Sequence, residues 1–113
     1  MKVLKDPYQV LRIMDAKLDE LRKKFDEAGE EKAAEIYGQE VAISSIARRV
    51  RHAIEVHDYF RMKDMEWVYE YVDNARENAH EYRNPRATWL MKGIAKRAAW
   101  ACAKLEDRME DQS

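Results

Sequence analysis

The sequence predicts an all-α protein: a single domain over residues 1–113 folded as an antiparallel four-helix bundle with a long second helix. Apolar residues recur at spacings of three and four along most of the chain, and no stretch of strand length alternates with period two. Only three glycines and two prolines occur, whereas 38% of the residues are charged. These features are typical of long helices joined by short connections.

The first helix is expected over about residues 7–28. Asp6 is a suitable N-cap, Pro7 fits the first helical position, and Gln9 is placed to complete a capping box. Gly29 is a natural stop. The following apolar residues define its buried face: Val10, Leu11, Met14, Leu18, Leu21 and Phe25.

The second helix is expected over about residues 30–60, where no proline interrupts the chain. Gly38 and the pair Ser44 and Ser45 weaken the helix locally, so a kink near either is an open alternative. In another alternative the long helix projects beyond the others and dimerises. Its expected core residues are Ile36, Ile43, Ile46, Ala47, Val50, Ile54, His57 and Phe60.

Two further helices are expected over about residues 63–82 and 85–110, the last capped by Asn84 with Pro85 in its first position. Each has one apolar stripe that faces the core. The third helix contributes Met65, Val68, Val72, Ala75, Ala79 and Tyr82, and the fourth contributes Leu90, Met91, Ile94, Ala98, Ala101, Cys102, Leu105 and Met109.

A second aromatic face is predicted on the last helix, opposite its apolar stripe. Trp89 and Trp100 are eleven residues apart and so project within roughly 20° of each other. Gly93 leaves room for close approach, and Lys92 and Lys96 form a charged rim. An aromatic centre with a charged rim is typical of a protein interface, so we expect partner binding here. The alternative is a last helix buried on every side, with both tryptophans in the core.

The third helix carries an acidic ridge, formed by Glu66, Glu70, Asp73, Glu77 and Glu81, with His80 at its edge. Like charges at this spacing repel one another. The ridge is either a solvated face or a docking surface for a basic partner. Its charge complements the lysine rim of the last helix, so one subunit's fourth helix is predicted to dock on another's third.

A polar stripe on the second helix suggests a different function. Tyr37, Arg48, His52 and Tyr59 follow one another at helical spacings, which suits an anionic aromatic ligand such as a nucleotide. Lys96 and Trp100 would complete the site across a subunit boundary. In the alternative, the tyrosines pack on a neighbouring helix and the charged residues pair at the surface.

A carboxylate and histidine metal site is a lesser alternative. Glu77 and His80 match the Glu-x-x-His spacing of di-iron bundles, with His52 and Glu55 as a facing pair. Such sites need two of these motifs and two further glutamates, all facing inward. We therefore expect no metal and no cofactor.

Composition excludes several classes of function. Lysine and arginine number 21 against 22 acidic residues, which disfavours nucleic-acid binding. Cys102 has no partner for a disulfide and is expected to be a small buried hydrophobe. The charged first residues and the lack of a long apolar stretch predict a cytoplasmic protein without a membrane span.

No catalytic motif is recognisable, and no glycine-rich loop could cradle a phosphate, so we expect no enzymatic activity. The leading hypothesis is a non-enzymatic bundle that acts by binding, either to itself as a homo-oligomer or to another protein as its regulator or inhibitor. Small helical proteins of this kind are common among bacterial and phage accessory factors.

Overall fold

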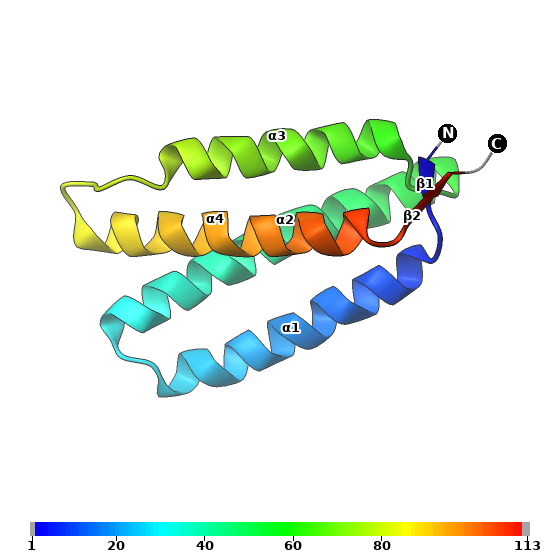
Figure 1. The fold of residues 1–113 in the computed structure, drawn as a ribbon. Helices are drawn as coiled ribbons and strands as arrows, with labels where there is room; N and C mark the ends of the chain where they lie inside the picture. Colours follow the sequence, from blue (N-terminus) through cyan, green and yellow to red (C-terminus); the bar gives the residue numbers. More distant parts are fainter. Residues whose placement is uncertain (1, 112–113) are drawn as a thin grey trace.

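Four helices packed against one another make up most of the chain, which confirms the all-α bundle (Figure 1). The structure is a computed structural model that describes residues 2–111. Consecutive helices run in opposite directions, and two short antiparallel strands join the ends of the chain. The elements are β1 (Lys2–Leu4), α1 (Pro7–Glu27), α2 (Glu30–His57), α3 (Met62–Asn78), α4 (Pro85–Glu106) and β2 (Met109–Asp111).

Two helices begin at the predicted caps. The Asp6 side chain accepts a hydrogen bond from the backbone N–H of Gln9 at 3.1 Å, and Pro7 opens α1. The Asn84 side chain accepts one from the N–H of Arg86 at 3.0 Å. These bonds satisfy backbone donors that have no partner within the helix.

The other helix ends correct the prediction. Helix α2 runs unbroken through Gly38 but ends at His57 rather than at residue 60, because Asp58 takes the left-handed conformation with φ of 63°. His57 is exposed, so its place in the predicted core is wrong. Phe60 is buried outside the helix, where its carbonyl accepts a hydrogen bond from the N–H of Leu4 at 2.8 Å.

The last two helices are also shorter than predicted. Helix α3 ends at Asn78 instead of residue 82, and α4 ends at Glu106 instead of residue 110. Met109–Asp111 pairs with Lys2–Leu4 in a ladder that the sequence did not indicate. Three residues are too few for a period-two pattern to be recognised.

The centre of the bundle is a close parallel contact between α2 and α4. Both helices carry a glycine there, and each glycine lies against the other helix's backbone. A Cβ atom added to Gly38 would overlap the carbonyl oxygen of Leu90, and one added to Gly93 would overlap that of Glu35. The two glycines therefore allow these helices to touch along their backbones, with α1 packed on α2 and α3 packed on α4.

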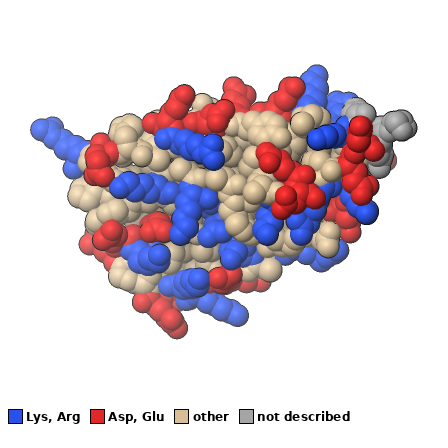
Figure 2. Space-filling view, in the orientation of Figure 1, with Lys and Arg blue, Asp and Glu red and all other residues tan. Residues whose placement is uncertain are grey.

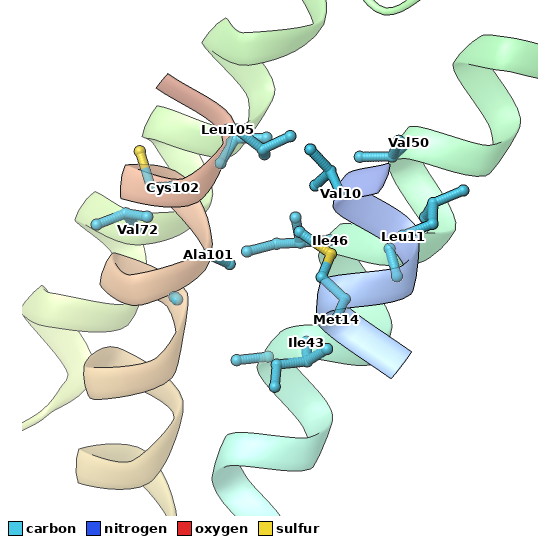
Figure 3. Close-up of a cluster of buried hydrophobic side chains, with 14 of the residues drawn as sticks. Val10, Leu11, Met14, Ile43, Ile46, Val50, Val72, Ala101, Cys102 and Leu105 are labelled. Atoms are coloured by element: carbon cyan, nitrogen blue, oxygen red, sulfur yellow. The ribbon is translucent and has the colours of Figure 1, made fainter. Parts of the chain in front are cut away.

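The hydrophobic core lies between these helices (Figure 3). Met14 of α1 and Ile46 of α2 are fully buried and face Ala101 of α4. Most predicted core residues are buried, but Phe25 is 41% exposed, so its predicted place in the core is wrong.

Candidate functional site

The predicted tryptophan face is only partly available to a partner. Trp89 and Trp100 are both half-buried. The two indoles therefore match neither alternative in full, since they form neither an open surface nor a part of the buried core. Gly93 is buried against the backbone of Glu35, so its predicted place on a partner-binding surface is wrong. The space that this glycine leaves is filled by α2 of the same chain.

The lysine rim is already paired within the chain. Lys92 Nζ lies 3.0 Å from a carboxylate oxygen of Glu81, and Lys96 Nζ lies 3.7 Å from one of Glu35. Both pairs are partly solvated and contribute little stability. A partner that bound these lysines would have to compete with these carboxylates.

Three cations surround the Trp100 ring. The charged groups of Lys17, Arg97 and Lys104 lie 5.6, 5.0 and 5.9 Å from its centre. Arg97 also donates two hydrogen bonds, of 3.0 and 2.7 Å, to the side-chain oxygen of the buried Gln39, and burial lowers the pKa of Arg97. Trp100 therefore contacts cations from α1 and α4, beside the hydrogen bonds that join α4 to α2.

The acidic ridge of α3 is solvent-exposed, as its sequence pattern allows. Within residues 2–111, no ion pair forms at Glu66, Glu70, Asp73 or Glu77. Figure 2 shows carboxylates along the edge of the molecule where α3 lies, and lysine and arginine side chains over α4 on the same face. Glu81 lies beyond the end of α3 and pairs with Lys92 instead. Docking of the ridge on a second subunit stays a prediction.

The predicted ligand stripe on α2 does not form one site. Tyr37 lines a groove near the start of α2, whereas Tyr59 lies beyond its end and has the guanidinium of Arg61 5.6 Å from its ring centre. The two tyrosines are therefore too far apart to enclose one ligand. Arg48 and His52 do lie together and line two hollows, one on each side of α2.

The hollow between α1 and α2 has a volume of about 550 Å³ and mixed charge. Arg48 and His52 share it with the carboxylates of Asp15, Asp19 and Glu55. Arg51, which also lines it, forms an ion pair of 3.1 Å with Asp15. An anion entering this groove would meet carboxylates as well as cations.

The hollow between α2 and α3 is smaller, about 210 Å³, and its lining contains no carboxylate. It is formed by Ser45, Arg48, Arg49, His52 and Trp67. The sequence did not connect Trp67 with this stripe, because the indole comes from another helix. One sequence observation pointed to another role for Trp67: it lies beside the predicted core stripe of the third helix rather than within it.

A third hollow is larger than these two: an apolar groove of about 770 Å³ at the α1–α2 turn, which we call the end groove. Phe25 is 41% exposed and Tyr37 is 53% exposed at this groove. The other lining residues are Ala33, Ala34, Ala87 and Leu90, with Glu30, Asn84 and Arg86 as polar members. The sequence missed the groove because it joins residues from three segments.

The helical basis of the metal alternative is lost in the structure. Because α3 ends at Asn78, Glu77 and His80 are not on one helix. The His80 ring stacks on Tyr82 at 4.2 Å between ring centres. Among the described residues, no group of three or more His, Cys, Asp or Glu side chains is placed to hold a metal ion.

Cys102 is buried, as predicted. Burial, together with a hydrogen bond to Glu106, raises the pKa of its thiol to about 12. A thiol held in its protonated form is a poor nucleophile. Cys102 therefore contributes packing rather than chemistry.

No protein-family model, curated protein or solved structure gives a match to this chain. The part of the chain that the structure describes has no helix that is both long and apolar enough to cross a membrane. The functional argument therefore depends on the surfaces and hollows described above.

Proposed function

We propose that this chain is a non-catalytic binding protein that works as a homodimer joined through the end groove. The main support is that exposed aromatic side chains and an apolar groove lie in the same surface patch. Phe25 and Tyr37 are exposed beside the small side chains of Ala33, Ala34 and Ala87. In a two-fold dimer the same patch meets itself, so it must offer both the aromatic side chain and the space that receives it.

The charges at the groove also suit a second copy of the chain. Glu30 and Arg86 are exposed, and Nη2 of Arg86 lies 3.2 Å from Oε1 of Glu30. The patch therefore carries both a negative and a positive charge. Across a two-fold axis, Glu30 of one copy can face Arg86 of the other without like charges meeting. The acidic ridge of α3 carries one sign only, so two copies of this ridge facing each other across a two-fold axis would repel each other.

Sedimentation of the full chain tests the dimer. We expect the wild type to sediment as a dimer and Tyr37→Arg as a monomer, because the substitution places a charge on the apolar patch. Tyr8→Arg is the matched control, since Tyr8 is 59% exposed at the start of α1 and outside the groove. A wild type that sediments as a monomer at high concentration, or a Tyr37→Arg variant that stays dimeric, would contradict the proposal.

A second role, as a regulator or inhibitor of another protein, is supported by the acidic ridge. Its carboxylates are exposed and make no ion pairs among residues 2–111, so they are available to a basic surface. Capture experiments that compare the wild type with a Glu66→Gln/Glu70→Gln/Glu77→Gln variant test this role. A basic partner should be lost in the variant, and a partner retained equally by both proteins would argue against the ridge.

A further inference from the structure

We infer that the pocket between α2 and α3, lined by Ser45, Arg48, Arg49, His52 and Trp67, binds a small phosphomonoester carried on an aromatic ring. This α2–α3 pocket is separate from the end groove, since the two share no lining residue. The inference therefore does not depend on the dimer. The argument rests on unpaired donors, on one buried nitrogen without an acceptor, and on the indole wall.

The first observation is a concentration of unpaired hydrogen-bond donors. The side chains of Arg48 and His52 make no hydrogen bond or ion pair with any described residue. The Ser45 hydroxyl already donates to the carbonyl of Val41 at 2.9 Å, so it is not one of these unpaired donors. An oxyanion can accept from guanidinium and imidazole donors at once, and such charge-assisted bonds are the strong ones.

The second observation concerns Arg49, whose guanidinium is only partly satisfied. Its Nη2 donates to the carboxylate of Asp64 at 3.3 Å, but its Nε is buried and has no acceptor. A buried donor without a partner is uncommon in proteins and costs stability. Arg49 also lines the pocket, so a ligand acceptor that reached this nitrogen would remove the cost.

Charge at the pocket favours an anion. Arg48 and Arg49 bring two positive charges, and Asp64, which is 6% exposed at its side chain, offsets one of them. The neighbouring hollow between α1 and α2 has three carboxylates in its lining and lacks this excess. The α2–α3 side of Arg48 is therefore the better anion site.

Trp67 supplies the apolar wall and favours a ligand with a ring. Its indole stacks on Tyr71 at 5.4 Å between ring centres, and the Arg49 guanidinium lies 5.7 Å from the indole centre. These contacts hold the indole in place, so a ligand ring meets a wall that is already ordered. A pocket of about 210 Å³ suits a single ring with its anionic group rather than a large ligand.

Isothermal titration of the full chain with phenyl phosphate and with inorganic phosphate tests the inference. We expect phenyl phosphate to bind the wild type more tightly than inorganic phosphate, because only the former contacts Trp67. Arg48→Gln should weaken phenyl phosphate binding by about tenfold or more, as expected when a charged donor is lost. The Arg48 side chain makes no hydrogen bond or ion pair with the described residues, and circular dichroism of the variant checks that the helices are intact.

Arg51→Gln is the matched control, because Arg51 lies three residues further along α2 and lines only the hollow on the α1 side. Its affinity should stay within about twofold of the wild type, since surface charges away from a site have small effects. Three results would overturn the inference: no binding of phenyl phosphate at millimolar concentration, equal loss in both variants, or binding of phenyl phosphate no tighter than that of inorganic phosphate. Tyr37→Arg should keep its phenyl phosphate affinity, which separates this test from that of the dimer.

Discussion

The two sides of α2 are packed in opposite ways. Toward α4 the backbones touch at Gly38 and Gly93, and no cavity separates them there. Toward α3 the helices make few contacts and leave the pocket lined by Arg48, His52 and Trp67. One helix thus supplies both a backbone-to-backbone contact and a basic hollow.

The difference follows from side-chain size. Glycine allows two helix axes to approach until backbone atoms meet, whereas arginine and tryptophan keep helices apart. Helix α3 packs mainly on α4, and its links to α2 include an ion pair of 3.3 Å between Arg49 and the buried Asp64. A hollow remains where large side chains, rather than glycines, separate two helices.

The largest effect is expected when a side chain is added to the glycines at the contact between α2 and α4. Gly93→Ala and Gly38→Ala should each lower the free energy of unfolding by about 2 kcal/mol or more, because the new methyl group meets backbone that cannot move aside. This loss exceeds the roughly 1 kcal/mol that alanine gains over glycine in a helix. Urea denaturation measures it.

Gly29→Ala is the matched control for the two core glycines. A Cβ at Gly29 would have nothing within 4 Å, and the residue only precedes α2 as its N-cap. Its stability should change by no more than about 1 kcal/mol. Equal losses at all three glycines would show that helix packing at Gly38 and Gly93 is not the cause.

A smaller effect is expected on the open side of α2. Asp64→Ala removes the partner of Arg49 and the acceptor of the Arg61 backbone N–H at 3.2 Å, which helps to begin α3. The free energy of unfolding should fall by about 2 kcal/mol in denaturation experiments. Asp73→Ala, an exposed carboxylate on the same helix, should change it by less than about 0.5 kcal/mol. Similar losses in both variants would contradict a special role for Asp64.

The last prediction concerns reactivity rather than stability. Cys102 of α4 lies beside Val72 of α3, so its reactivity reports on how firmly α3 packs there (Figure 3). Cys102 is 8% exposed, and its thiol pKa of about 12 against the ordinary 9.0 leaves roughly a thousandfold less thiolate near neutral pH. We expect alkylation of the native protein to be slower than that of the urea-unfolded chain by about this factor. Asp64→Ala should speed the reaction if loss of the α2 link loosens α3. A native thiol that reacts as fast as the unfolded one would show that α3 separates readily from α4.

The sequence predicted the helices and the caps at Asp6 and Asn84, because periodicity and capping are local properties. It placed the ends of three helices too late, since no glycine marks the left-handed turn at Asp58 and the pairing of β1 with β2 depends on contacts distant in sequence. It also recognised that Trp89, Gly93 and Trp100 imply a second contact for the last helix. It assigned the glycine to another molecule, whereas α2 of the same chain lies there.

What the sequence determined by itself is therefore the class of the fold and the side chains on each helix face. Only the tertiary structure decided which faces meet, because helix periodicity gives directions around an axis but not the identity of the neighbour. It separated Tyr37 from Arg48 and His52, and it brought Trp67 to them from another helix. The physical reason is the glycine contact between α2 and α4, which brings those two helices together and leaves α3 beside an open side of α2.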